Sequence, residues 1–168
     1  FGRIAQAVAQ KAHFGFGMQV SFYDPYPPSD EIIKKFSAKK FNTLEDVLKD
    51  SDYVTLHCPG GGDNINLMNK ERFALMKKSA FLINTARGDV VDETALVQAL
   101  KDKVIAGAGL DVYAKEPVVT EELLSMNNVV IIPHLGSATT ETRVAMGLRS
   151  LENVEAFFNG KEPGDRVA

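Results

Sequence analysis

Apolar runs without polar alternation recur along the chain, and segments with helical spacing lie between them. The apolar runs predict strands in MQVSFYD (18–24), DYVTLHCP (52–59), AFLINTA (80–86), VIAGAGLDVY (104–113) and NVVIIPH (128–134). Helical spacing and caps predict helices over 3–13, 42–51, 70–79, 92–102, 120–126 and about 139–159, the last stopped by Gly160. Helices that alternate with uniformly apolar strands indicate a parallel sheet covered on both faces. The predicted fold class is therefore α/β.

Two further patterns refine this picture. Ile4, Val8 and Ala12 are spaced four residues apart, so they line one face of the first helix, which the glycines of FGFGM end. Leu96, Val97 and Leu100 form a similar apolar side on the helix over 92–102. The stretches DPYPPSDE (24–31) and PGGGDNIN (59–66) are predicted loops because they are rich in Pro, Gly and Asn.

Composition narrows the class of protein. The 168 residues, 45% of them hydrophobic and 24% charged, are enough to bury one core, so we expect a soluble globular domain. A net charge of −3 argues against a nucleic-acid partner, and the apolar stretches are too short to cross a membrane. The single cysteine, Cys58, is compatible with a reducing, cytoplasmic setting and is most simply a small packing residue.

Polar side chains follow the predicted strands at their carboxyl ends, where ligands bind in parallel sheets. These places are occupied, in chain order, by Asp24, by His57, Cys58 and Pro59, by Arg87, by Glu116 and by His134. Each alone has an ordinary interpretation as a solvated charge, a turn residue or a packing residue. Together an Arg that grips a carboxylate, a His that moves a proton and a Glu that orients the His form a complete acid–base set.

The start of the chain suggests a dinucleotide site. Gly2 and Ala5 match the second and third small residues of a Gly-x-Gly-x-x-Gly/Ala loop, a weak signal because such fragments are common. Asp24 follows about 20 residues later, where a carboxylate binds the adenosine ribose diol and repels a 2′-phosphate. This position predicts NAD over NADP. A turn-forming Asp before Pro25 is the alternative.

These stretches, in this order, resemble the D-isomer-specific 2-hydroxyacid dehydrogenases along the whole chain. FGRIAQAVA is similar to the glycine loop of that family, LINTARGDVVDETAL to its arginine signature, AGLDVYAKEP to its glutamate signature and VVIIPHLGSATTETR to its histidine signature. The resemblance implies a Rossmann-type doubly wound parallel sheet and NAD as the cofactor. It also implies that Arg87 binds and polarises a 2-oxo acid, that His134 is the general acid/base, and that Glu116 pairs with His134.

The resemblance further implies a set of cofactor contacts. Asp111 would hold the nicotinamide carboxamide, and Gly2, Arg3 and Ile4 would cradle the pyrophosphate. The predicted cofactor-binding set is completed by Asp24, His57, Pro59, Thr85, Ala86 and Gly136, and we predict no metal site. Many members of the family have a Thr/Pro-containing loop where this chain has PGGGDNINLM. A weaker affinity of this chain for NAD is therefore an open alternative.

The function expected from this resemblance is hydride transfer between NAD(H) and a small 2-oxo or D-2-hydroxy acid, with glyoxylate or hydroxypyruvate as the preferred guess. Formate is disfavoured because formate dehydrogenases carry Gln in place of Glu116. Two alternatives remain: a non-catalytic NAD(H)-sensing corepressor, and another Rossmann protein such as a methyltransferase, in which Arg87, Glu116 and His134 would have no role. The family resemblance also suggests a homodimer.

Family members are about twice this length and carry a second, flavodoxin-like substrate domain. We therefore expect residues 1–136 to form the NAD-binding domain without its first strand, which would precede Phe1 in the sequence. Residues 137–168 are expected to form a C-terminal helix and tail that return to the substrate domain, itself largely absent from this sequence.

Overall fold

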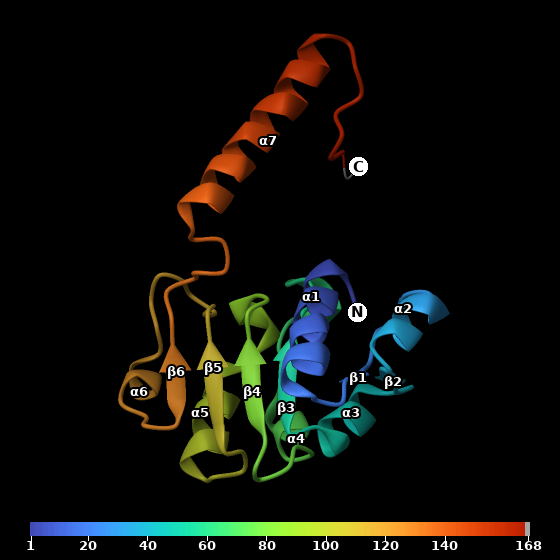
Figure 1. Ribbon diagram of the computed structural model, residues 1–168. Helices are drawn as coiled ribbons and strands as arrows, with labels where there is room; N and C mark the ends of the chain where they lie inside the picture. Colours follow the sequence, from blue (N-terminus) through green and yellow to red (C-terminus); the bar gives the residue numbers. More distant parts are fainter. Residues whose placement is uncertain (167–168) are drawn as a thin grey trace. The chain divides into compact units, whose positions relative to one another are not determined.

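The computed structural model describes residues 1–166 and divides the chain into two compact units (Figure 1). The first unit comprises Phe1–Pro133, and the second begins at His134. The last two residues of the segment predicted over 137–168 lie outside the described part of the chain.

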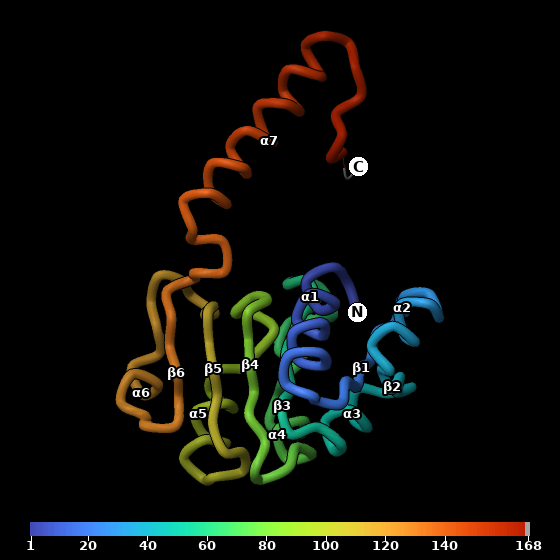
Figure 2. The backbone as a smooth tube through the Cα atoms, in the orientation of Figure 1, coloured from blue at the N-terminus to red at the C-terminus, as the bar shows by residue number. Residues whose placement is uncertain are grey.

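A parallel sheet forms the centre of the first unit. Its strands lie side by side in chain order: β3 (Tyr53–Leu56), β4 (Phe81–Asn84), β5 (Gly107–Leu110) and β6 (Val129–Ile131). The register pairs Leu56 with Asn84, Asn84 with Leu110, and Leu110 with Ile131. All four carboxyl ends therefore meet at one edge of the sheet, as the arrowheads in Figure 1 show; Figure 2 traces the same four strands side by side. The predicted Rossmann-type α/β class is confirmed.

A second, smaller parallel sheet pairs β1 (Ser21–Phe22) with β2 (Lys39–Lys40). Within the described residues, no strand joins β1 to β3. Both strands are only two residues long, so the strand predicted over 18–24 is limited to Ser21–Phe22.

Helices lie on both sides of the main sheet, with α1 on the near side in Figure 1 and α5 on the far side. Their bounds are α1 (Arg3–Gln10), which runs into a π-helical turn η1 (Lys11–Gly15), α2 (Asp30–Lys35), α3 (Leu44–Asp50), α4 (Lys70–Phe73), α5 (Glu93–Lys101) and α6 (Glu121–Leu124). Side chains of Thr43, Asn69 and Asp92 accept backbone N–H groups at the starts of α3, α4 and α5. These caps satisfy donors that a helix start leaves unpaired.

The core lies between the sheet and the helices of its far side. Its fully buried side chains include Leu48, Met68, Phe73, Leu82, Leu96 and Ile105. Leu96, Val97 and Leu100 of α5 are all buried, as their spacing predicts.

The helix predicted over 3–13 is present, and the face lined by Ile4 and Val8 is exposed. Ile4 is 70% exposed and Val8 40%, whereas Ala5 and Ala9 are buried. Ala5 and Ala9 therefore form the buried side of α1, and the larger apolar residues lie on its exposed side. Helix α2 also begins inside the loop predicted over 24–31, with Ser29 as its N-cap and Asp30 and Glu31 in its first turn, where acidic groups favour the helix dipole.

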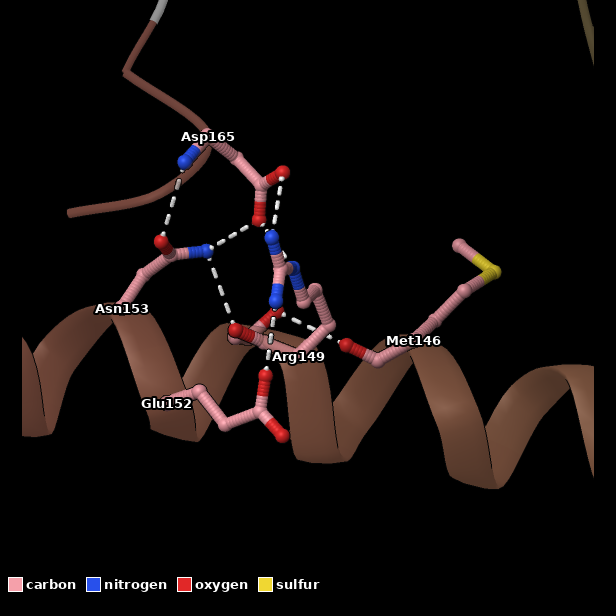
Figure 3. A network of polar contacts seen from close by, with 6 residues as sticks. Met146, Arg149, Glu152, Asn153 and Asp165 are labelled. Atoms are coloured by element: carbon pink, nitrogen blue, oxygen red, sulfur yellow. Dashed lines mark hydrogen bonds and ion pairs between the residues drawn. The ribbon is translucent and has the colours of Figure 1, made fainter.

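The second unit consists of a short loop, helix α7 (Thr140–Phe158) and a tail. Thr139 caps α7, and Gly160, with φ 67°, follows its end, as predicted. The tail is tied back to α7 by Asp165, which accepts hydrogen bonds from the Arg149 guanidinium and from Asn153 Nδ2 at 2.7 Å (Figure 3). Carboxylates of Asp165 and Glu152 raise the pKa of Arg149 above its usual range. Within residues 1–166, no helix is long and apolar enough to span a bilayer.

Candidate functional site

The turn after β4 presents Arg87, and a buried amide shapes that turn. Asn84, the last residue of β4, is 1% exposed. Its Oδ1 accepts a hydrogen bond from Ala86 N at 3.0 Å, and its Nδ2 donates to Arg87 O at 2.9 Å. Arg87 Nη1 donates to Ala86 O at 2.7 Å, and the side chain as a whole is exposed. Because its backbone is fixed on both sides by one side chain, Arg87 leaves the strand in a defined direction. Asn84 belongs to no motif in the sequence that points to this role.

The loop after β5 carries Glu116 and packs against the arginine turn. Gly88 makes this possible, since a Cβ at this position would lie 1.9 Å from the carbonyl carbon of Tyr113 and 2.0 Å from its oxygen. Glu116 Oε1 accepts a hydrogen bond from Tyr113 N at 3.1 Å. The structure therefore brings the segments that hold Arg87 and Glu116 together at the same edge of the sheet.

Two residues without a predicted role hold the Glu116 loop. Tyr113 donates its hydroxyl to Leu110 O at 3.1 Å and to Ile132 O at 2.8 Å, which links the ends of β5 and β6. Glu93 accepts hydrogen bonds from Ala114 N at 2.7 Å and from the Thr120 hydroxyl. Such long-range polar contacts give no periodic signal in a sequence, which is why Tyr113 and Glu93 were missed.

Asp111 directly follows β5 and is 4% exposed. Its backbone N donates to Asn84 O at 2.9 Å, one position beyond the ladder between β4 and β5. The predicted cofactor residues Thr85 and Ala86 stand in the adjacent turn, Thr85 exposed and Ala86 buried. Three predicted cofactor residues are thus placed beside Arg87.

His57, Cys58 and Pro59 follow β3. Burial lowers the pKa of His57, which favours a neutral imidazole, and its Nε2 lies 3.1 Å from Thr55 Oγ1. Burial also raises the pKa of the Cys58 thiol, and the nearby Asp89 carboxylate raises it further. Cys58 is therefore a poor nucleophile, in agreement with its interpretation as a packing residue.

The start of α1 meets the end of β1. The backbone N of Phe1 lies against Asp24 Oδ2, which places this acid beside the first turn of α1. Gly2 is the N-cap and supplies no side-chain acceptor to the first N–H groups of α1. Asp24 Oδ1 also accepts a hydrogen bond from Tyr26 N at 2.8 Å. The turn-forming role considered for Asp24 is therefore real, and its Oδ2 is turned toward α1.

Arg3 and Ile4 are exposed in that first turn. A helix N-terminus with open backbone N–H groups and a nearby strand-end acid is the pair that binds a dinucleotide's pyrophosphate and ribose. The residues present fit NAD.

His134 and Gly136 belong to the second unit. His134 has φ 52°, a left-handed conformation that is uncommon for residues other than Gly and that clusters at functional sites. Its pairing with Glu116 stays a prediction. In the described residues, no three His, Cys, Asp or Glu side chains gather in a way that could hold a metal ion.

A parallel sheet with helices on both faces, an open helix N-terminus beside a strand-end acid, and an arginine turn define a dinucleotide-binding domain of the Rossmann type. A model of the D-isomer specific 2-hydroxyacid dehydrogenase, NAD binding domain, matches residues 1–136. The chain belongs to this family, and the resemblance drawn from its motifs is confirmed.

Relatives of known name agree with this assignment. The chain is 49% identical over 163 residues to a glyoxylate reductase of Thermococcus kodakarensis, covering 97% of this chain and 48% of the relative. It is 45% identical over 161 residues to glyoxylate/hydroxypyruvate reductase B of Erwinia tasmaniensis, covering 95% and 50%. The chain thus spans about half the length of these relatives.

Solved structures show the same fold. An NADPH-dependent glyoxylate/hydroxypyruvate reductase from Sinorhizobium meliloti, in complex with NADP and malonate, superposes with a TM-score of 0.93 at 35% identity. That match covers 99% of this chain and 50% of the other. The D-lactate dehydrogenase of Lactobacillus jensenii, with NAD+, gives 0.88 at 33% identity, covering 99% and 53%.

Proposed function

We propose that this chain is the cofactor-binding part of an enzyme that reduces a small 2-oxo acid to a D-2-hydroxy acid with NADH. The observation that carries the proposal is the arginine turn. Asn84 and Gly88 fix Arg87 at the edge of the sheet, next to the loop that holds Glu116. A fixed, exposed guanidinium beside a dinucleotide site is suited to gripping a carboxylate by paired hydrogen bonds.

In the proposed reaction, the cofactor and three residues of the chain have separate roles. NADH, when bound, supplies the hydride. Arg87 binds the carboxylate of the 2-oxo acid and draws charge from its carbonyl, His134 delivers a proton to the new alkoxide, and Glu116 favours the charged imidazolium. In this proposal the protein contributes position and charge, and the cofactor contributes the electrons.

Glyoxylate or hydroxypyruvate is the proposed substrate, supported by the names of the relatives. Asp24 supports NAD over NADP, because it follows β1 at the position where a carboxylate binds the ribose diol and a 2′-phosphate would meet a like charge. The relative that uses NADP makes this preference worth measuring on the chain itself.

The remaining proposals concern the whole protein. Residues 1–136 form the NAD-binding domain, and the segment from 137 returns to a substrate domain. A homodimer and a cytoplasmic setting stay predictions.

The test is a steady-state assay that follows NADH consumption with glyoxylate, hydroxypyruvate, pyruvate and phenylpyruvate. His134→Ala should lower turnover strongly and leave NADH affinity nearly unchanged. His13→Ala is the matched control, since His13 lies in η1, where its Nδ1 is 3.2 Å from Met18 O, and has no role in the proposed site. Near-normal turnover in His134→Ala would remove His134 from the mechanism.

The same experiment separates the alternatives. NADH binding without turnover of any 2-oxo acid would favour the sensor, and binding of S-adenosylmethionine in place of NADH would favour a methyltransferase.

A further inference from the structure

The loop after β3 contains three consecutive glycines, Gly60–Gly62. Gly61 and Gly62 have φ of 75° and 52°, conformations that glycine adopts at no steric cost. Three glycines lose much backbone freedom when they are ordered, so a loop of this composition needs an anchor to keep one shape.

Asp89, two residues after Arg87, is that anchor. Its Oδ2 accepts a hydrogen bond from Gly61 N at 2.8 Å, and its backbone O accepts one from Asn66 N at 2.8 Å. One residue therefore fastens the loop near both of its ends. The attachment continues downstream, where Met68 N donates to Val90 O at 2.9 Å.

The fastened loop lies against the base of the Arg87 side chain. A Cβ on Gly60 would lie 3.0 Å from Arg87 Cβ, 3.1 Å from Arg87 Cγ and 2.6 Å from Asp89 Oδ1. Gly60 therefore lies so close to Arg87 that a side chain at its position would not fit without a shift of its neighbours. The loop backbone forms a wall that restricts the first rotatable bonds of Arg87.

The Asp89 carboxylate is partly buried, and its Oδ1 is shielded from solvent with no hydrogen-bond partner in the described residues. A shielded carboxylate oxygen without a donor is unfavourable for stability. Packing alone would therefore not favour an Asp at this position. The contribution of its carboxylate is the hydrogen bond that it accepts from Gly61 N.

We propose that Asp89 is a positioning residue that holds the Gly60–Gly62 loop against Arg87 and so sets the direction of the guanidinium. The inference rests on the proposed function, in which Arg87 binds the carboxylate of a 2-oxo acid. Without the anchor, the loop leaves Arg87 and the side chain samples more rotamers. Affinity for the 2-oxo acid falls, while hydride transfer from a correctly bound substrate is unchanged.

The experiment compares Asp89→Ala, Asp89→Asn and Asp92→Ala in the protein as it is naturally produced. Asp92 Oδ1 accepts Ala95 N at 3.0 Å as the cap of α5, so Asp92→Ala removes a similar bond three residues away. Asp89→Asn keeps an oxygen that can accept Gly61 N. Three quantities are measured: KM and kcat for glyoxylate, the dissociation constant for NADH, and hydrogen exchange of the peptide covering 59–67.

In Asp89→Ala we expect faster exchange in 59–67 and a KM for glyoxylate raised about tenfold, the factor for a lost hydrogen bond to a charged group. We expect kcat and NADH affinity to stay within about twofold of the parent, a change too small to count as a lost contact. Asp89→Asn should restore most of the KM. Asp92→Ala should lower the melting temperature and leave KM unchanged.

Unchanged exchange in Asp89→Ala would refute the anchor. Faster exchange with an unchanged KM would refute the link from loop to arginine, as would a KM change of equal size in Asp92→Ala. If the parent protein turns over no 2-oxo acid, the proposed function fails, the KM effect fails with it, and the exchange data alone decide whether Asp89 anchors the loop.

Discussion

Replacing Gly88 by Ala tests the contact that joins the arginine turn to the Glu116 loop. The new Cβ would lie 1.9 Å from Tyr113 C, 2.0 Å from Tyr113 O and 2.4 Å from Ala114 N. Carbon atoms in contact sit about 3.5–4.0 Å apart, so the two backbones must separate by roughly 1.5–2 Å. No side chain can rotate to relieve this overlap because every atom it meets belongs to the main chain.

The expected loss of stability follows from that geometry. Overpacking typically costs 1–3 kcal/mol, and we expect Gly88→Ala to lie at about 3 kcal/mol because backbone must move. For a domain of this size, that loss lowers the melting temperature by roughly 6–12 °C. Since Arg87 precedes Gly88, displacement of the turn by about 1 Å also lowers kcat/KM for a 2-oxo acid by about 100-fold.

Gly109→Ala is the matched control within the same sheet. Its Cβ would meet Ile83 Cδ1 at 3.1 Å, the far end of a side chain that can rotate away. We expect a cost below about 1 kcal/mol, or less than roughly 2–4 °C. The assay is thermal unfolding followed by circular dichroism. Equal melting temperatures for the two variants would refute the argument from backbone overlap.

Three further outcomes are expected. Cys58 should react with iodoacetamide at pH 8 more slowly than free cysteine, because burial and the Asp89 charge raise its pKa and so reduce the thiolate fraction. Asp89→Asn should speed the reaction, and an unchanged rate would contradict the charge effect. Tyr113→Phe leaves two strand-end carbonyls without their donor and should cost about 1–3 kcal/mol in urea unfolding, whereas a neutral effect would mean that water replaces the hydroxyl. Thr43→Ala removes the cap that accepts Asp46 N and should cost about 1 kcal/mol in the same assay, with Thr43→Ser close to the parent.

Apolar runs and caps were enough to predict the strands of the main sheet, α5 and α7. Leu96, Val97 and Leu100 are buried as their spacing requires, and the polar residues stand after the strands as expected. These features depend on local or periodic patterns, so a single sequence is enough to predict them.

Other features depend on contacts across the fold. The spacing of Ile4 and Val8 predicts a shared helix face, but it does not show that burial falls on Ala5 and Ala9. The roles of Asn84, Tyr113 and Asp89 rest on which distant amide or carbonyl each one meets, and residue type alone does not specify that. The roles of Arg87, Glu116 and His134 stay predictions, carried by the motifs and tested by the assays above.

The short pairing of β1 with β2 has a consequence for how the chain responds to its cofactor. A parallel pair of two-residue strands contributes few ladder hydrogen bonds, so the segment 18–41 is held mainly by other contacts, among them those of the buried Phe22 and Phe36. Asp24 lies in this segment, and a ligand that binds it only in its closed form adds its binding free energy to the stability of that segment. A bound cofactor would then hold this segment closed for longer and reduce its exposure to proteolysis.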